Sequence, residues 1–390
     1  MKIIIFGGDG YLGWPTAMYL SKKNIEVYCV DNFSKRKIEL ENGIKPLFNI
    51  ETMQNRVKIW NKKSKVLKRV KFVYGDLLNH RFLYEIVNKI KPDAVVHYAE
   101  QPSAPYSMAG RDQAVFSQHN NIIGSLNLLF AIKKYCPNCH IVKLGTMGTY
   151  GTPNIIIEEG FLKVKHKGRS DVVQFPMKPQ SFYHLSKAAD SLNLAFACRV
   201  WGMRATDLNQ GVVYGTDTNE TKLSEELRTS FHYDHLFGTV INRFLVEASE
   251  NIPLTIYGGG EQKRTFLNIN DTLRCVELAL KNPAKKGEYK VRNQFTEIFS
   301  IKELAQKILI AGKNIGITVK IKNIKNPRVE MSKHYYRPTN KSFIRIGLKP
   351  ILLKIKYLEE QILMIKKNVN KKIIRDIINP KVQWNQKDLK

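Results

Sequence analysis

The sequence predicts an α/β protein with a doubly wound parallel sheet and a smaller C-terminal lobe. Over the first 215 residues, short β-branched runs alternate with stretches of helical periodicity, which indicates successive strand–helix–strand units. The alternation weakens from residue 216, and Ile and Leu mix with Lys at helical spacing from residue 351. We therefore expect a first domain over 1–215, a second lobe over 216–350 that interleaves with it, and a lysine-rich helical tail over 351–390.

The expected elements follow the apolar patterns in chain order. Strands are expected at 2–6, 25–30, 71–74, 94–97, 140–144 and 204–208. Helices are expected at 11–23, 81–91, 113–135 and 182–200. The stretch 32–69 is longer than an ordinary crossover, so we expect an insertion with its own helix. For the tail we favour a packed helix with a solvated lysine face over a membrane-surface helix.

The charge and hydropathy of the chain exclude several classes of protein. It has 63 basic and 34 acidic residues and a formal net charge of +29. The lysines spread along the whole chain without a nucleic-acid-binding pattern, so we expect no nucleic-acid partner but an attraction for anionic ligands. There is no apolar run of about 18 residues, so we expect no membrane span. The first residues carry no secretory or transit signal, and we expect a cytoplasmic protein or a mature one already stripped of its leader.

The five cysteines are an odd and sparse set, which is not typical of a disulfide framework. Cys136 and Cys139 form a CxxC pair, but a zinc site would need a second ligand pair at suitable spacing. We therefore expect two ordinary reduced thiols and no metal.

A glycine-rich segment follows the first expected strand. Residues 7–13 read Gly-Gly-Asp-Gly-Tyr-Leu-Gly and lead into a helix, and the second strand ends in Asp31, 18 residues after Gly13. Glycines let a pyrophosphate approach the backbone at a helix N-terminus, and a carboxylate at this separation binds the adenosine ribose. The pattern predicts a Rossmann-type domain that binds NAD rather than NADP, with Asp76 near the adenine.

Tyr183 and Lys187 form a YxxxK pair on an expected helix, where residues four apart share one face. We expect the lysine ammonium to lower the tyrosine pKa and to bind the nicotinamide ribose. The tyrosine can then act as a general base on a sugar hydroxyl, which Thr146 orients from the end of the preceding strand.

These parts, in this order, resemble the extended short-chain dehydrogenases/reductases, which modify nucleotide sugars. The segment 258–266, Gly-Gly-Gly-Glu-Gln-Lys-Arg-Thr-Phe, with Asp271 resembles that family's phosphate-binding segment, so the second lobe is expected to bind the nucleotide sugar and Arg264 its diphosphate. The expected cofactor-binding residues are Gly7, Gly10, Tyr11, Leu12, Gly13, Asp31, Asn32, Lys35, Asp76, Leu77, Asn120, Tyr183, Lys187, Gln210 and Val213. The expected substrate-binding residues are Thr146, Gln210, Thr239, Arg243, Thr255, Tyr257, Gln262, Arg264 and Arg328.

Longer strings resemble one family within this group, the UDP-sulfoquinovose synthases. They include Ala-Pro-Tyr-Ser-Met at 104–108, Lys-Leu-Gly-Thr-Met-Gly at 143–148, the segment 204–215 and Asn-Pro-Arg-Val-Glu at 326–330. The resemblance runs to about residue 350 and more faintly to Trp384. It implies that UDP-glucose and sulfite become UDP-sulfoquinovose through C4 oxidation by NAD, loss of water across C5–C6, sulfite addition at C6 and C4 reduction. It also implies a homodimer through the two long helices, and it leaves open whether a partner protein donates the sulfite.

Five positions bear on the reaction. Ordinary 4,6-dehydratases place Asp-Glu after the threonine, whereas this chain has Met147-Gly148, as the sulfosugar family does. His184 is then a candidate proton shuttle, with an ordinary helix histidine as the alternative. That family usually has Arg at position 102 and Glu at position 149, where this chain has Pro102 and Thr149. The alternative function is a UDP-sugar 4-epimerase or dehydratase without sulfonation, and the intact Thr146, Tyr183 and Lys187 argue against a non-catalytic NAD-binding regulator.

Overall fold

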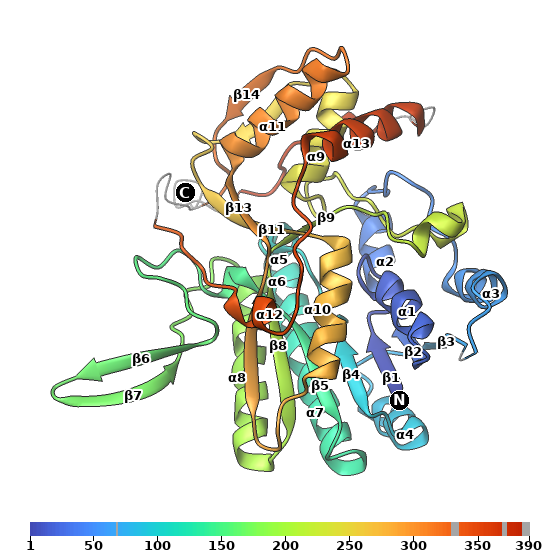
Figure 1. Ribbon diagram of the computed structural model, residues 1–390, viewed down its shortest axis with the longest axis vertical. Coiled ribbons are helices and arrows are strands. Elements are labelled where there is room, and N and C mark those ends of the chain that lie inside the picture. Colours follow the sequence, from blue (N-terminus) through green and yellow to red (C-terminus); the bar gives the residue numbers. More distant parts are fainter. Residues whose placement is uncertain (68, 329–334, 369–372, 384–390) are drawn as a thin grey trace.

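Seven parallel strands form the central sheet of the computed structural model, in the order β12-β8-β5-β4-β1-β2-β3 (Figure 1). Their bounds are β1 (Lys2–Phe6), β2 (Glu26–Asp31), β3 (Lys71–Tyr74), β4 (Ala94–His97), β5 (His140–Thr146), β8 (Arg204–Gln210) and β12 (Tyr289–Gln294). The structure describes residues 1–67, 69–328, 335–368 and 373–383. Chain order reverses between β1 and β4, and at such a point the carboxyl ends of parallel strands open a crevice for a ligand. The six expected strands are confirmed to within two residues at each end.

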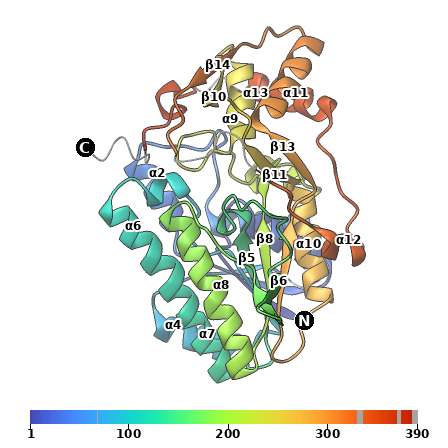
Figure 2. The same ribbon diagram turned by 90° about the vertical axis from the view of Figure 1, so that its left-hand side faces the viewer.

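Helices cover both faces of the sheet, so the predicted doubly wound α/β fold is confirmed. Side chains of β1 alternate between two cores, with Ile3 and Ile5 in one and Ile4 and Phe6 in the other. The first core is covered by α1 (Gly13–Lys22), α3 (Met53–Lys63), α10 (Ile269–Lys281) and α12 (Lys341–Arg345). The second is covered by α4 (His80–Ile90), α7 (Gly124–Tyr135) and α8 (Phe182–Trp201), which lie side by side in Figure 2.

The expected helix at 113–135 is wrong as a single element. The chain instead forms α6 (Arg111–Gln118), a π-helical turn at His119–Ile123 and α7. The wide turn places Asn120 and Asn121 inside the protein, where the Asn121 amide donates to Ser186 Oγ at 2.8 Å and accepts from the Gln101 N–H at 2.8 Å. Hydropathy spacing cannot reveal one extra residue in a turn, and such turns are frequent at functional sites.

The insertion after β2 contains two helices, α2 (Ser34–Glu41) and α3, where one was expected. A second unexpected feature lies between β5 and α8. There β6 (Phe161–His166) and β7 (Arg169–Gln174) form an antiparallel hairpin that extends away from the body of the protein (Figure 1). Short elements α5 (Ala104–Ser107) and a 3-10 turn at Met147–Thr149 complete this side of the sheet.

The second lobe packs around its own apolar core. It holds a sheet of β9 (Val212–Tyr214), β11 (Lys263–Asn268) and β13 (Glu297–Ser300), and the parallel pair β10 (Leu254–Tyr257) and β14 (Ile321–Ile324). Its helices are α9 (Val240–Ser249) and α11 (Ile301–Asn314), with 3-10 turns at Thr221–Leu223 and Glu225–Leu227. After residue 215 the chain also returns to the first domain, because β12 is a strand of the central sheet and α10 packs against one face of that sheet.

The described part of the tail packs on this lobe. Helix α13 (Ile355–Asn368) buries Leu358, Ile362 and Ile365 in the lobe core and leaves Lys366 and Lys367 exposed, so the expected packed helix is confirmed. A 3-10 turn at Arg375–Ile377 follows, and Trp384 lies outside the described residues. Within the part of the chain that is described, none of the helices is long and apolar enough for a transmembrane span. All five cysteines are thiols, as expected for Cys136 and Cys139.

Candidate active site

A cavity of about 780 Å³ lies at the carboxyl edge of the central sheet and is lined by both the first domain and the second lobe. It brings together most of the residues predicted from the sequence. The predicted residues that line it are Gly7, Gly10, Tyr11, Leu12, Gly13, Asp31, Asn32, Lys35, Asp76, Leu77, Asn120, Thr146, Tyr183, His184, Gln210, Val213, Thr239, Arg264 and Arg328. One space therefore joins the dinucleotide loop, the catalytic candidates and two arginines.

The glycine loop has room for a phosphate but not for side chains. A Cβ added to Gly13 would lie 2.0 Å from the Gly7 carbonyl oxygen, so α1 can begin this close to β1 only with glycine at position 13. Leu12 precedes the helix and makes no side-chain cap, which leaves the positive end of α1 facing the cavity lining. These residues fit the pyrophosphate of a dinucleotide.

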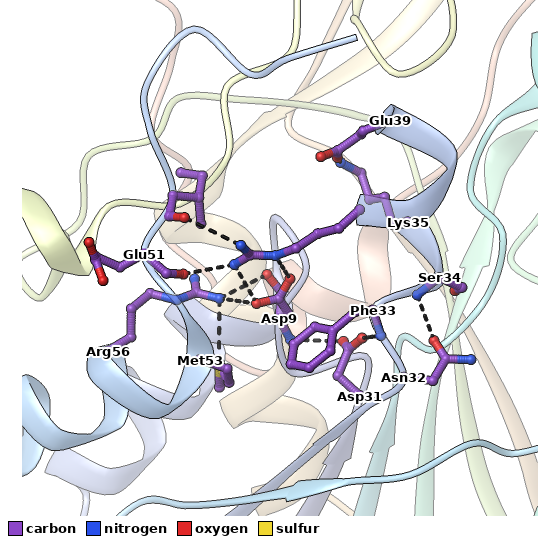
Figure 3. A network of polar contacts seen from close by, with 12 residues as sticks. Asp9, Asp31, Asn32, Phe33, Ser34, Lys35, Glu39, Glu51, Met53 and Arg56 are labelled. Carbon is purple, nitrogen blue, oxygen red and sulfur yellow. Dashed lines mark hydrogen bonds and ion pairs between the residues drawn. The ribbon is translucent and has the colours of Figure 1, made fainter. Parts of the chain in front are cut away.

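A network of charged groups holds the far end of the loop (Figure 3). The Asp31 carboxylate accepts hydrogen bonds from the Asp9 N–H at 2.9 Å and the Phe33 N–H at 2.8 Å. Asp9 in turn binds Arg36 at 2.6 Å and the buried Arg56. Burial, reinforced by Asp9, raises the pKa of Asp31 to about 6. The carboxylate is thus fixed in place where a ribose hydroxyl of the dinucleotide can meet it. The sequence pattern missed Asp9, Arg36 and Arg56, because an ion pair across 47 positions leaves no local signal.

A second polar cluster closes the cavity beside α2. Lys35 contacts Glu39 and lies 2.5 Å from His232 Nε2, and His232 Nδ1 lies 3.0 Å from the Asp234 carboxylate. His232 belongs to the second lobe, so this cluster ties the lobe to the first domain over the cavity. Sequence analysis selected Lys35 but missed His232.

Tyr183 and Thr146 meet at the catalytic end. Thr146 ends β5, and Tyr183 lies in the first turn of α8, where its N–H donates to Ser107 Oγ at 3.0 Å. Burial raises the pKa of Tyr183 well above its usual range, the Glu100 carboxylate raises it further, and a hydrogen bond with Thr146 lowers it. The pKa of Tyr183 is thus raised overall by burial and Glu100, and the lowering expected from Lys187 stays a prediction.

Lys187 lies beneath the cavity rather than in its lining. Its ammonium is 2.5 Å from Glu100 Oε2 and also donates to the Leu144 carbonyl. Burial lowers the pKa of Lys187, while Glu100 opposes the shift. Glu100 itself lines the cavity, and sequence analysis did not select it. Contact between Lys187 and the nicotinamide ribose stays a prediction.

His184 lines the cavity next to Tyr183. Its Nδ1 lies 2.9 Å from Ser181 Oγ, and a Cβ added to Gly148 would lie 2.3 Å from its Cδ2 and Nε2, so glycine at position 148 makes room for the ring. Burial, together with Arg328 and Arg264, lowers the pKa of His184 to about 3. The imidazole is therefore neutral near pH 7, and a neutral imidazole can donate one hydrogen bond and accept another.

The two positions that depart from the sulfosugar family lie in different surroundings. Pro102 lines the cavity, so a side chain there can touch a ligand. Thr149 is fully buried, and its hydroxyl donates to the Thr146 carbonyl oxygen at 2.9 Å. Position 149 thus supports Thr146 from behind.

Four predicted substrate residues lie outside the cavity lining. Arg243 donates to the Tyr257 hydroxyl at 2.7 Å and to the Thr255 carbonyl at 2.8 Å, and Gln262 donates to the Tyr257 carbonyl at 2.8 Å. These residues bind one another within the second lobe, and their contact with substrate stays a prediction.

Comparison with known proteins agrees with this arrangement. Residues 3–293 match the model of the NAD dependent epimerase/dehydratase family. The chloroplastic UDP-sulfoquinovose synthase of Spinacia oleracea is 48% identical over 98% of this chain and 79% of its own length. The UDP-sulfoquinovose synthase of Sulfolobus acidocaldarius is 40% identical over 98% of both chains.

Solved structures show the same fold at low sequence identity. A UDP-glucose 4-epimerase from Thermotoga maritima superimposes with a TM-score of 0.70 at 19% identity, covering 95% of this chain and all of its own. A dTDP-glucose 4,6-dehydratase from Streptomyces venezuelae superimposes with a TM-score of 0.69 at 18% identity, covering 95% and 98%. The chain therefore belongs to the NAD dependent epimerase/dehydratase family, in the branch that contains the UDP-sulfoquinovose synthases.

Proposed function

We propose that the protein converts UDP-glucose and sulfite into UDP-sulfoquinovose, with NAD as its cofactor. The observation that carries the proposal is the single cavity that joins the glycine loop, Thr146, Tyr183 and Arg264. The two relatives named UDP-sulfoquinovose synthase, aligned over nearly the whole chain, support it. In the overall reaction the C6–O bond of glucose breaks and a C6–S bond forms. UDP-glucose, sulfite and one proton give UDP-sulfoquinovose and water, with no net oxidation.

The residues present fit a dinucleotide at one end and a nucleotide sugar at the other. The glycine loop and the N-terminus of α1 would hold the pyrophosphate, and Asp31 the adenosine ribose. NAD held there would supply the hydride acceptor for oxidation at C4 and, once reduced, the hydride donor for the final reduction. Arg264 and Arg328 would bind the UDP diphosphate by charge-assisted hydrogen bonds.

Tyr183 is assigned as the acid–base group at the C4 oxygen. Its phenol passes its own proton on to the protein as it takes the hydroxyl proton when C4 is oxidised, and the reverse transfer occurs when C4 is reduced. Thr146 hydrogen-bonds Tyr183 and orients the same hydroxyl. The C4 ketone acidifies the C5–H bond, which allows water to leave across C5–C6 and sulfite to add at C6.

His184 is assigned to the proton movements of elimination and addition. Its neutral ring lies beside Gly148, which stands where ordinary dehydratases carry an acid. A neutral imidazole can take the C5 proton and later return it, and the positive charges of Arg264 and Arg328 favour sulfite in the same space. A cytoplasmic location and a sulfite-donating partner protein stay predictions.

We also propose a homodimer. Helices α6 and α8 adjoin each other (Figure 2). Their exposed apolar side chains are Val115 on α6 and Phe182, Leu185, Leu192 and Phe196 on α8. Such a patch is typical of an interface between subunits. Light scattering coupled to size exclusion should give twice the chain mass, and Leu192→Glu should return it to the monomer mass.

The function is tested by mass spectrometry of products formed from UDP-glucose with and without sulfite. The proposal expects a sulfonated nucleotide sugar that appears only when sulfite is present. A product lighter by one water, or an isomer of UDP-glucose, formed regardless of sulfite would instead support the dehydratase or epimerase alternative.

A further inference from the structure

Beneath Tyr183 the structure holds a cluster of buried charged groups to which the proposed reaction assigns no role. Its members are Glu100 after β4, Lys143 on β5, Lys187 and Asp190 on α8, and Asp207 on β8. Each of these side chains is at most 3% exposed. Five ionisable groups in a dry region are costly unless their charges balance, so their presence calls for an explanation.

The cluster is continuous with the catalytic end of the cavity. Tyr183, Lys187 and Asp190 recur at spacings of four and three residues, which places them along one face of α8. Glu100 lines the cavity and contacts the Lys187 ammonium at 2.5 Å. Carboxylate oxygens of Glu100 and Asp190 lie within 4.8 Å of each other and of a His97 ring nitrogen. The polar groups thus lead from the substrate end into the core.

The charges of the cluster do not balance without an extra proton. Lys143 and Lys187 supply two positive charges, whereas Glu100, Asp190 and Asp207 supply three negative ones. Asp207 is well held, because it accepts hydrogen bonds from Ser191 at 2.6 Å and Tyr289 at 2.8 Å. Asp190 is held less firmly, since its ion pair with Lys143 is 3.6 Å long.

Asp190 and Glu100 are the groups best placed to share that proton. Burial, with Glu100 adding to it and Lys143 and Lys187 opposing it, raises the pKa of Asp190 to about 7. The titratable and charged groups that face the pair are His97 after β4, Lys143 on β5, Lys187 on α8, Asp207 on β8 and Tyr289 on β12. The two ammonium groups in this set make His97, Glu100 and Asp190 unsuited to a metal cation.

We propose that Glu100 and Asp190 form a buried proton store that serves Tyr183 through Lys187. When the C4 hydroxyl is oxidised, Tyr183 passes its own phenol proton to Lys187 as it takes the hydroxyl proton, and Lys187 passes one N–H proton to the pair, which then holds two. The reverse transfer supplies the proton for the final reduction. The protons of C4 oxidation and C4 reduction thus balance within the protein, and the one proton that the overall reaction consumes enters with sulfite. This inference rests on the proposed function for its role in the cycle but not for the existence of the shared proton.

The shared proton is tested first without substrate or cofactor. Infrared difference spectra of the full chain, recorded from pH 5 to pH 9, should show a protonated carboxyl band that disappears near pH 7. The pKa values of Asp31 and Asp271 are about 6, below that of Asp190, and both residues remain in the Asp190→Asn variant. Subtracting the spectrum of that variant therefore isolates the band of the shared proton. Asp112→Asn, on the surface, is the matched control and should keep it. If Asp190→Asn fails to fold, Glu100→Gln takes its place in the experiment, and its carboxyl band should be shifted or lost. A band that is absent from the wild type, or unchanged in both variants, would overturn the store.

The role in the cycle is tested by proton release. NAD-loaded protein is mixed with UDP-glucose, without sulfite, in weak buffer containing a pH indicator dye. The wild type should form reduced cofactor with almost no proton in solution, whereas Glu100→Gln or Asp190→Asn should release close to one proton per reduced cofactor. Release of a full proton by the wild type would overturn the role. If no reduced cofactor forms at all, the proposed function fails, while the infrared titration still decides on the store.

Discussion

Single residues at the catalytic end owe their protonation states to burial. Tyr183 keeps its proton and His184 remains neutral near pH 7, because each charged form would lose its hydration. These two neighbours are therefore ready to exchange protons with a substrate rather than with water. The sequence identified both, since a YxxxK pair and its flanking residue are local features. It could not identify Glu100, which acts from a loop 83 positions earlier in the chain.

Tyr183→Phe should reduce turnover by about 100-fold or more, because a positioned acid–base group contributes that much. Affinity for UDP-glucose should change little, since the ring remains. Absorbance of reduced cofactor and calorimetric titration measure the two effects. The exposed Tyr74→Phe is the control. Near wild-type turnover would remove Tyr183 from the mechanism.

Arg264→Ala should weaken UDP binding by about 1.5–3 kcal/mol, the contribution of a charge-assisted hydrogen bond. This loss corresponds to an increase of roughly 10-fold to 150-fold in Kd. Calorimetry with UDP provides the measurement, and Arg199→Ala on the exposed face of α8 provides the control. Equal affinities in the two variants would rule out Arg264 as a phosphate ligand.

Pro102→Arg should lower the KM for sulfite, because position 102 lines the cavity and a guanidinium there can pair with an oxyanion. Removing proline also frees the loop, so Pro102→Ala separates the loop effect from the charge effect. Initial rates at varied sulfite give both constants. Identical behaviour of the Arg and Ala variants would show that charge at this position does not matter.

At the scale of elements, helix α8 holds Tyr183, His184 and Lys187, whereas the β6–β7 hairpin extends away from the body of the protein (Figure 1). The boundaries of the six expected strands were predictable to within two residues, because buried parallel strands appear in the sequence as apolar runs. The hairpin was missed because neither of its strands has a strong apolar face: β6 alternates Lys and Val, and β7 begins Arg-Ser-Asp. The π-helical turn was missed because it keeps the hydropathy of its neighbours.

The hairpin contributes little to stability beyond its base. Phe161 packs against Tyr289, with ring centroids 6.2 Å apart, and Leu162 packs against the small apolar cluster that contains Met147 and Tyr150, whereas Val172 is 62% exposed. Replacing residues 163–172 with an Asn-Gly turn should shift Tm by less than about 3 °C, equivalent to about 1 kcal/mol. Thermal unfolding followed by circular dichroism measures it. A larger drop would mean that the outer part of the hairpin is packed in solution.

At the scale of the whole molecule, buried histidines and buried acids act on stability in opposite directions. Burial, aided by Arg204 and Lys290, lowers the pKa of His140 to about 4. The unfolded chain binds a proton at this residue below its ordinary pKa of about 6.5, but the folded chain does not. Its contribution is therefore complete above pH 6.5 and is lost as pH falls toward 4. Asp31, with its raised pKa, acts in reverse: its contribution is complete below about pH 4 and is lost as pH rises through 6.

His140→Gln should thus become more stable relative to the wild type as the pH falls from 6.5 to 4. The relative gain should reach about 3 kcal/mol at most, from roughly 1.4 kcal/mol per pKa unit. Glutamine can keep the hydrogen bond that joins His140 Nε2 to Thr206, 2.9 Å away. Urea unfolding at several pH values tests it, and parallel stability curves for both proteins would contradict the assignment.

The sequence predicted the fold, the cofactor loop and one face of the cavity, because each depends on residues close together in the chain. The cluster of Lys35 with His232, and the network of Asp9 with Arg36 and Arg56, arise only when separate crossovers bring loops together. Arg243 and Tyr257, which the resemblance suggested as ligands, hydrogen-bond each other within the lobe, and their contact with substrate stays a prediction.

Strand β12 pairs with β8 although 78 residues separate the end of one from the start of the other. During synthesis, the edge of β8 therefore emerges long before its neighbour. At about 5–20 residues per second, the ribosome leaves that edge unpaired for on the order of ten seconds. An open edge invites pairing with other chains. Production of this protein should consequently depend on chaperones and on slow, cool expression, even though the finished molecule covers that edge completely with β12.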